Sequence, residues 1–192
     1  SLDIPSKKNI FIYPAQFWAH KNHKYILDVA TELKKNNIED IFFVFSGFDK
    51  GNLNYIKKSI ENNKLDKYIK IFGYIDDYQL ISLYLKCSGV IMPTFVGHST
   101  IPMYEAFFFK KNIFYTKDLS DISLKNLLTE IDINQVDSFI KSYNFIKDNK
   151  LFNDKKLDEA KLFFDKFCDD ETIANNFNKV FKEYEKFKNT WS

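Results

Sequence analysis

Apolar runs and amphipathic stretches alternate along the chain between residues 9 and 116. The short runs are rich in Ile, Phe, Val and Tyr and end in turn residues, as buried strands of a parallel sheet do. The stretches between them show helical spacing of apolar residues or carry helix-capping residues. The expected strands are 9–15, 41–47, 68–75, 90–94 and 112–116, and the expected helices are 25–33, 52–63, 76–89 and 101–111.

This alternation predicts an α/β fold, a Rossmann-like doubly wound parallel sheet of five or six strands with helices on both faces. The third expected helix begins with Asp76, which suits an N-cap, and ends with Gly89, which suits a C-cap. Beyond Ser120 the pattern becomes mainly helical. We expect a linker at 1–8, a Rossmann-like donor-nucleotide-binding domain at 9–170 and an amphipathic helix at 171–192. The apolar stripe of that last helix consists of Ile173, Phe177, Val180, Phe181, Tyr184 and Phe187.

The composition fits one well-buried domain, with or without a tail, because 45% of the 192 residues are hydrophobic and 18% are aromatic. The formal net charge is only +2 and no dense basic block occurs, which argues against nucleic acid as the main partner. All 28 basic residues are lysines. A phosphate would therefore have to be held by lysine, hydroxyl and backbone N–H groups, since no arginine can clamp it.

Cysteine content and hydropathy favour a cytoplasmic protein. Cys87 and Cys168 are far apart and form no metal-binding pattern, so we expect free, reduced thiols. No apolar stretch is long enough to span a bilayer, and the N-terminal sequence SLDIPSKKN has no signal-peptide core. Its polar, proline-containing character is more typical of a linker that enters a domain.

Three loops of unusual chemistry follow expected strands. They are AQFWAHKNH at 15–23, GYIDD at 73–77 and TFVGHST at 94–100. In doubly wound sheets, ligands bind outside the carboxyl ends of the strands. Because all three loops follow parallel strands, we expect them to converge at that edge.

The third loop and the helix after it combine groups that suit a phosphate and a sugar diol. Ser99 or Thr100 can cap the helix, and Gly97 would let a phosphate approach the free N–H groups there. Glu105 lies one turn into the helix, where a carboxylate can accept two hydrogen bonds from a ribose. Each feature also has an ordinary explanation, because caps start many helices and a glutamate interacts favourably with the helix dipole. His98 can donate to a phosphate oxygen or be only a loop residue.

The other two loops offer a cation and a backbone turn. Lys21 lies near the start of the first helix, where a cation opposes the dipole and a bound diphosphate would compensate it; a solvated lysine is the alternative. His20 and His23 have H-x-x-H spacing but lack the glutamate of a zinc helix, so we predict no metal site. At Gly73 the backbone could bond a nucleobase while Ile75 packs on its face, or the turn simply leads into the next helix.

Taken together, these segments resemble the C-terminal half of a GT-B glycosyltransferase of family 4, within the glycosyl transferases group 1, from about Lys7 to Phe187. The family's signatures occur in order as YPAQFWAHKNHKYILDVA, FFVFSG, IKIFGYIDDYQLISLYLKCSGVIMPT and GHSTIPMYEA. The most specific are the helix that ends in Leu-Tyr before a strand ending in Pro-Thr, and the P-x-x-E-A ending. The resemblance implies a retaining, metal-independent sugar transferase that requires no cofactor and uses a UDP- or GDP-sugar as donor.

The resemblance also implies roles for single residues. Lys21 matches the basic residue that neutralises the diphosphate leaving group. Glu105 matches the second glutamate of the family's E-x7-E motif, which holds the ribose. Two segments match the loop whose amides meet phosphate and sugar and the turn that contacts the base. These segments are Gly97, His98, Ser99, Thr100 and Ile101, and Gly73, Tyr74 and Ile75.

Two positions depart from the family pattern. Gly97 stands where many members have the first glutamate, and Gln16 stands where many have an arginine beside the lysine. These departures leave the donor sugar open. They also favour an alternative function, a non-catalytic Rossmann-like nucleotide-binding or interaction module. A Rossmann-like enzyme of another kind has less support, because neither G-x-G-x-x-G after the first strand nor G-x-x-x-x-G-K-[ST] occurs.

GT-B enzymes bind the acceptor in an N-terminal Rossmann domain, and nothing in this sequence corresponds to one. We therefore expect the donor-binding half of a hexosyltransferase, inactive alone, whose parent acts on a polysaccharide, oligosaccharide or lipid-linked acceptor. The N-terminal acceptor domain of the same parent chain is then its partner. That domain would also provide any peripheral attachment to a membrane.

Overall fold

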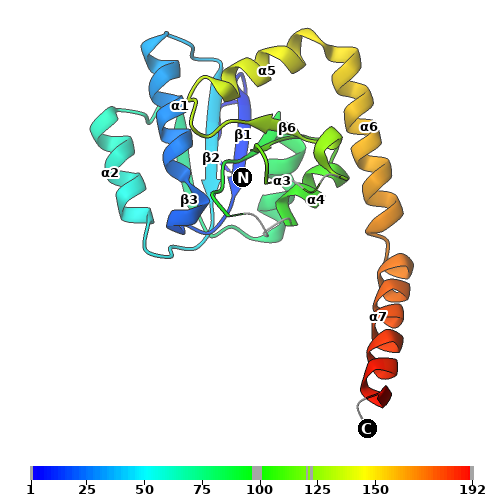
Figure 1. Cartoon of the computed structure of the whole chain (residues 1–192). Helices are drawn as coiled ribbons and strands as arrows, with labels where there is room; N and C mark the ends of the chain where they lie inside the picture. Colours follow the sequence, from blue (N-terminus) through cyan, green and yellow to red (C-terminus); the bar gives the residue numbers. More distant parts are fainter. Residues whose placement is uncertain (1, 97–100, 120, 122, 191–192) are drawn as a thin grey trace.

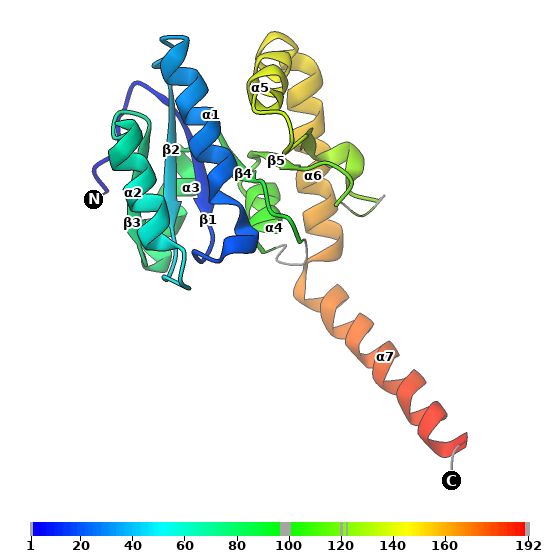
Figure 2. The ribbon, with the colours of Figure 1, turned by 60° about the vertical axis from the view of Figure 1, so that its left-hand side comes forward.

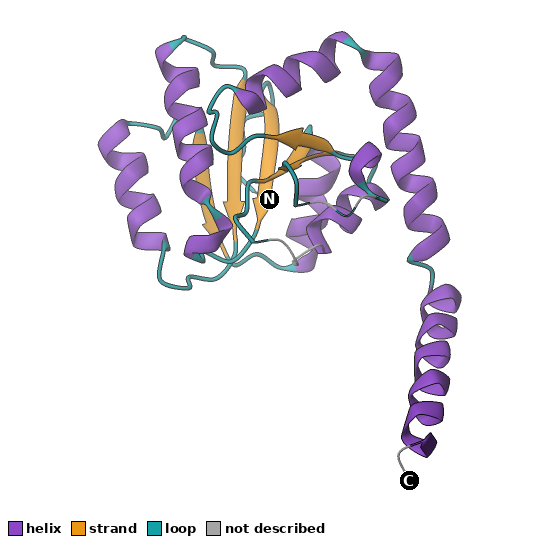
Figure 3. Ribbon diagram, in the orientation of Figure 1, coloured by secondary structure: helices purple, strands orange, loops and turns teal. Residues whose placement is uncertain are grey.

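A single parallel sheet organises the chain, which the computed structural model describes over residues 2–96, 101–119, 121 and 123–190. The sheet has six strands in the order β3-β2-β1-β4-β5-β6, with helices on both faces (Figures 1 and 3). This is the strand order of a doubly wound Rossmann fold, so the predicted fold class is confirmed. The strands are β1 (Asn9–Pro14), β2 (Ile41–Ser46), β3 (Ile69–Gly73), β4 (Gly89–Met92), β5 (Asn112–Thr116) and β6 (Thr129–Ile131).

Helices connect successive strands and cover the sheet. α1 and α2 lie on one face and α3 on the other (Figure 2). The α-helices are α1 (His23–Lys35), α2 (Leu53–Asn63), α3 (Asp77–Lys86), α4 (Ile101–Phe108), α5 (Ser138–Asp148), α6 (Lys150–Phe167) and α7 (Asp170–Thr190). Two short 3-10 helices, η1 (Ala19–Lys21) and η2 (Lys125–Leu127), precede α1 and β6.

The core is aromatic and lies between the central strands and the helices. Every residue of β2 is buried, as expected for a strand covered on both faces. The ring of Phe11 in β1 makes edge-to-face contacts with Phe114, Phe139 and Tyr143 at centroid distances of 5.5, 5.0 and 5.3 Å. Two of these partners belong to α5, so the helix that follows β6 closes the core over the middle of the sheet.

One prediction about local structure fails, and one strand was not located from the sequence. Gly89 does not cap α3, because that helix ends at Lys86 and the Cys87 N–H donates to the Leu83 carbonyl at 2.8 Å. Gly89 is instead the first residue of β4, where an added Cβ would lie 2.9 Å from the Asn112 carbonyl oxygen. Glycine at this position therefore allows β4 to pair closely with β5. The sixth strand, β6, was allowed for but not located, since its three residues are too few and too polar to form a recognisable run.

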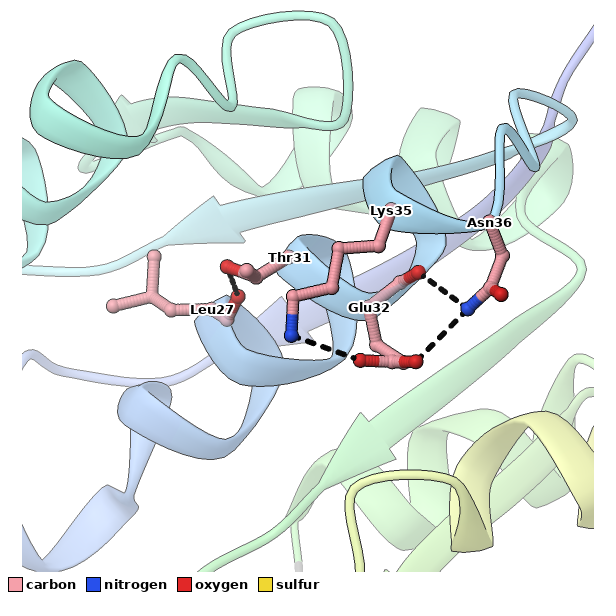
Figure 4. Close-up of polar contacts among 5 residues, drawn as sticks. All are labelled: Leu27, Thr31, Glu32, Lys35 and Asn36. Carbon is pink, nitrogen blue, oxygen red and sulfur yellow. Dashed lines mark hydrogen bonds and ion pairs between the residues drawn. The ribbon is translucent and has the colours of Figure 1, made fainter.

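The exposed face of α1 ends in a set of polar contacts (Figure 4). The Asn36 side chain donates to the Glu32 carbonyl and to the Glu32 carboxylate, both at 2.9 Å. Lys35 pairs with the same carboxylate at 3.4 Å, and the Thr31 hydroxyl donates to the Leu27 carbonyl at 2.8 Å. The Asn36 backbone N–H also donates to the Glu32 carbonyl, at 3.1 Å, so backbone and side chain of Asn36 together close the last turn of α1.

The two ends of the chain differ in how they contact the sheet. The segment expected to be a linker packs along the β3 edge, where Leu2 and Ile4 contact the core and Asp3 pairs with Lys70 at 2.5 Å. α7 extends away from the rest of the chain (Figures 1 and 2), and the residues of its predicted apolar stripe are exposed. Within the part of the chain that the structure describes, no helix is both long and apolar enough to cross a membrane.

Candidate functional site

A pocket of about 500 Å³ opens at the carboxyl edge of the sheet, between the loop after β1 and the start of α4. The strand order reverses between β1 and β4, so this pocket lies at the topological switch point where Rossmann folds bind ligands. Four residues predicted from the sequence line it together: Gln16, Lys21, Ile101 and Glu105. The remaining lining residues are Pro14, Ala15, Trp18, His20, Leu80 and Pro102.

Backbone hydrogen bonds hold the loops of three strands against one another. The Gly47 N–H after β2 donates to the Gly73 carbonyl at the end of β3 at 2.7 Å. Gly47 also packs against the loop after β1, where an added Cβ would lie 2.4 Å from the Ala15 carbonyl oxygen. The Phe17 N–H donates to the Phe48 carbonyl at 2.9 Å. The loop that carries Lys21 is therefore fixed by its neighbours.

Lys21 ends the short helix η1 and is buried beside the pocket. The Tyr13 hydroxyl donates to its carbonyl at 2.9 Å, and Asn22 follows in the left-handed conformation, with φ of 53°, to begin α1. Lys21 as a residue is only 9% exposed, and among the described residues it forms no ion pair. Burial lowers the pKa of its ammonium. A buried cation at a pocket without a counter-ion is suited to an anionic ligand.

Glu105 lines the same pocket, from the first turns of α4, and its carboxylate is oriented by Tyr84. The Tyr84 hydroxyl donates to Glu105 Oε2 at 2.6 Å. Tyr84 is 1% exposed and its ring stacks on Phe109 at 5.2 Å, so the donor is fixed in place. Burial, together with the charge of Glu105, raises the pKa of Tyr84, which keeps its hydroxyl a proton donor. Glu105 Oε1 makes no hydrogen bond within the described part of the chain.

An aromatic group forms the outer wall of the pocket. The Trp18 indole N–H donates to Gln16 Oε1 at 2.9 Å, and the Trp18 ring stacks on His20 at 6.0 Å. The ammonium of Lys50 lies 5.7 Å from the centroid of the Trp18 ring. Gln16 therefore presents an uncharged side chain whose carbonyl oxygen already accepts the indole N–H of Trp18.

The turn predicted to contact a base lies beside this pocket but does not line it. Gly73 has a positive φ of 67°, which favours glycine there. Tyr74 is exposed and its ring stacks on Phe48 at 4.6 Å, while Ile75 is partly buried against the core. The predicted loop residues Gly97, His98, Ser99 and Thr100 lie outside the described residues, and so does the predicted cap of α4.

The two histidines of the H-x-x-H pattern have different environments. His20 is exposed and lines the pocket. His23 is fully buried, with its ring 4.8 Å from Tyr13 and 5.0 Å from Phe17, and burial followed by the charge of Lys21 lowers its pKa to about 3. Among the described residues, no group of three or more His, Cys, Asp or Glu side chains could hold a metal ion.

Sequence reasoning missed two groups that shape this pocket, Trp18 and Tyr84. Tyr84 belongs to the Leu-Tyr helix ending that gave the family resemblance, but its spacing to Glu105 in the sequence carries no sign of contact. Trp18 stands in the loop after β1, and only the folded loop shows that its indole N–H bonds Gln16. Both contacts arise from tertiary structure.

The model of the family Glycosyl transferases group 1 matches residues 1–120 of the chain. A search of curated proteins found no significant match. Among solved structures, a glycosyltransferase from Rickettsia africae superimposes with a TM-score of 0.80 at 19% identity, covering 94% of this chain and 49% of that one. The Anabaena protein HepE, in complex with UDP and glucose, gives 0.77 at 12% identity, covering 92% and 49%.

A third similar structure is the C-terminal domain of a glycosyl transferase group 1 family protein from Francisella tularensis. Its TM-score is 0.67 at 19% identity, and the match covers 82% of this chain and 84% of that one. At these identities the three likenesses establish a shared fold. The present chain spans about half the length of the Rickettsia and Anabaena proteins.

Proposed function

Because this chain belongs to the glycosyl transferases group 1, we propose that it is the donor-binding half of a retaining, family-4 glycosyltransferase. One observation carries the proposal. Lys21, which is buried and forms no ion pair with the described residues, and the oriented carboxylate of Glu105 line one pocket at the topological switch point. A cation and a fixed hydrogen-bond acceptor in one pocket suit the diphosphate and the ribose of a nucleotide-sugar.

The charge of Lys21 would act on the leaving group. Negative charge accumulates on the diphosphate as its bond to the sugar breaks, and a positive charge already in place stabilises that state. Since Lys21 is held by a fixed loop and is partly desolvated, little reorganisation is needed. We propose that this lysine, together with backbone N–H groups, supplies the charge neutralisation and that transfer needs no metal ion or other cofactor.

Glu105 would hold the ribose through the oxygen that Tyr84 leaves free. The hydrogen bond from Tyr84 uses Oε2 and restricts rotation of the carboxylate. Binding of a diol costs less conformational entropy when the carboxylate already has a fixed orientation, because a freely rotating side chain would have to be immobilised. The base would then lie towards the turn at Gly73, Tyr74 and Ile75.

The comparisons suggest which donor nucleotide to test and which half of the parent enzyme this chain represents. The Anabaena HepE structure contains UDP and glucose, so UDP is the first nucleotide to test, with GDP second. The similarity to a separate C-terminal domain from Francisella tularensis supports assignment of this chain to the C-terminal half. The acceptor would bind to an N-terminal domain of a longer, cytoplasmic parent, and this half alone would be inactive.

Calorimetric titration of the chain with UDP, GDP, ADP and dTDP tests the proposal. We expect one nucleotide to bind. Lys21→Met or Glu105→Gln should lower its affinity by about ten- to a hundredfold, because each removes one charged contact worth roughly 1.5–3 kcal/mol. Lys34→Met is the matched control, since this exposed lysine lies at the far end of α1. Equal affinity in all variants would refute the assignment of the site.

The alternative is a non-catalytic nucleotide-binding or interaction module. It is favoured by Gln16, whose side chain is uncharged and bonded to Trp18 where a second cation would strengthen phosphate binding. If no nucleotide binds at millimolar concentration, the same titration on the full-length parent separates the two functions. No binding by the parent would support the interaction module, and sugar transfer by a parent that binds would distinguish the transferase from a nucleotide-binding module.

A further inference from the structure

A second pocket lies at the opposite edge of the sheet from the candidate donor site. It has a volume of about 450 Å³ and is formed by η2, the start of β6, the end of α5 and the first turns of α6. Figure 1 shows how β6, α5 and α6 are arranged. Thr129, the first residue of β6, lines it, so the pocket is at the amino end of that strand. The volume is within the range of small-molecule sites.

One buried cation distinguishes this pocket. Lys156 as a residue is only 5% exposed, and its ammonium donates to the Thr129 hydroxyl at 2.5 Å. Within the described residues it forms no ion pair. The other lining lysines do, because Lys125 lies 3.7 Å from Glu130 and Lys155 lies 3.8 Å from Glu159. The pocket therefore presents one uncompensated positive charge, and a neutral hydroxyl is a weak partner for a buried ammonium.

The rest of the lining is apolar. Leu128 and Ile146 are buried in the wall, whereas Phe145 and Phe152 remain 54% and 57% exposed beside it. Their rings meet edge to face at 6.0 Å and so form one apolar surface. A small inorganic anion would satisfy Lys156 but leave these rings in water, while a ligand with an apolar part would cover them.

We infer that this pocket binds a monoanionic amphiphile, a compound that joins one carboxylate or phosphodiester group to an apolar chain. The anionic group pairs with Lys156 and accepts a hydrogen bond from its ammonium. The apolar chain of the ligand lies against Phe145 and Phe152. A single net positive charge matches a monoanion better than a phosphate dianion. This inference does not depend on the proposed transferase function, because none of its residues lines the donor pocket.

Calorimetric titration of the chain with octanoate at pH 7 tests the inference, with acetate as the anion without a tail and octyl glucoside as the tail without a charge. Octanoate should bind at least about tenfold more tightly than either. Lys156→Met should lower the affinity for octanoate by at least about tenfold, because it removes the charged hydrogen-bond donor. Lys155→Met is the matched control and should change affinity less than about threefold, since that lysine is exposed and already paired.

The pH dependence gives a second readout. Burial lowers the pKa of Lys156 to about 8, and the groups facing it are Lys125, Thr129, Lys155 and Glu159. The protonated fraction at a pKa of about 8 falls about tenfold between pH 7 and pH 9, so octanoate affinity should fall by about the same factor. If Lys156→Met does not unfold cooperatively, Phe152→Ala replaces it, since that exposed ring can be removed without disturbing the core.

Phe152→Ala should lower the affinity for octanoate and leave the affinity for acetate unchanged.

Sedimentation with phosphatidylglycerol vesicles identifies the source of the ligand. If the unmodified chain sediments and Lys156→Met does not, the amphiphile is a membrane lipid, and if only octanoate binds, it is a free carboxylate. Octanoate that binds no better than acetate or octyl glucoside would overturn the inference. Equal octanoate affinity in the unmodified chain and both variants would do the same.

Discussion

The buried imidazole of His23 should make the fold sensitive to mild acid. Its ring is enclosed by Tyr13, Phe17 and Phe45, and neither ring nitrogen has a hydrogen-bond partner among the described residues. Burial, and secondarily the charge of Lys21, lowers its pKa from 6.5 to about 3. The native state therefore holds His23 neutral at pH values where the unfolded chain binds a proton.

The sign and size of the effect follow from proton linkage. Between pH 6.5 and pH 3 the unfolded state carries more protons than the native state, so the free energy of unfolding falls as the pH falls. The slope is about 1.4 kcal/mol per pH unit, which gives a loss of about 2 kcal/mol at pH 5 relative to pH 8 from this residue alone. The stability that a neutral His23 provides is fully present above pH 6.5.

The assay is urea unfolding at pH 5, 6, 7 and 8, followed by circular dichroism, of the unmodified chain and of His23→Leu. Leucine is apolar and of similar size, so it removes the titrating group with little change in packing volume. The difference in unfolding free energy between the two chains should shift by about 2 kcal/mol in favour of the variant between pH 8 and pH 5. His20→Leu, at an exposed histidine, is the control. A pH dependence that is the same in the unmodified chain and His23→Leu would refute the reasoning.

Three further predictions concern local contacts. Gly89→Ala should destabilise the fold by about 1–3 kcal/mol in urea unfolding, because the new Cβ would lie 2.9 Å from the Asn112 carbonyl oxygen; an unchanged midpoint would contradict it. Tyr84→Phe should lower nucleotide affinity by about tenfold in calorimetry, since Glu105 loses its orienting donor, and unaltered affinity would show that Glu105 needs no support. Asp76→Ala should lower the unfolding free energy by about 1 kcal/mol through loss of the capping box, whereas Asp77→Ala should cost less.

The sequence predicted most of the sheet because most of its strands are continuous apolar runs. β2 is the clearest example, since all its residues are apolar up to Ser46 and all are buried. The capping of α3 by Asp76 could also be predicted, because a capping residue is a signal within a few neighbouring residues. β6 and the position of Gly89 could not be predicted. Both depend on the close approach of strands that are distant in sequence, which leaves no periodic pattern.

The candidate site shows the same division between local and tertiary information. Lys21 and Glu105 were named from loop chemistry and family resemblance, but their burial and shared pocket depend on three loops that meet at one edge. The role of Tyr84 depends on a hydrogen bond between two helices that follow different strands. Residue types can therefore suggest a ligand, while only the fold shows which groups orient it.

The environment of Lys21 also links the candidate site to the stability of the core. The charge of Lys21 contributes to the lowered pKa of His23, so an anion bound at Lys21 would offset part of that charge. The pKa of His23 should then rise towards its ordinary value, and the loss of stability between pH 6.5 and pH 3 should become smaller. Any ligand that binds only the native state also raises stability by mass action. The linkage at His23 is distinguishable, because a bound nucleotide should reduce the acid sensitivity of the unmodified chain but not alter the pH dependence of His23→Leu.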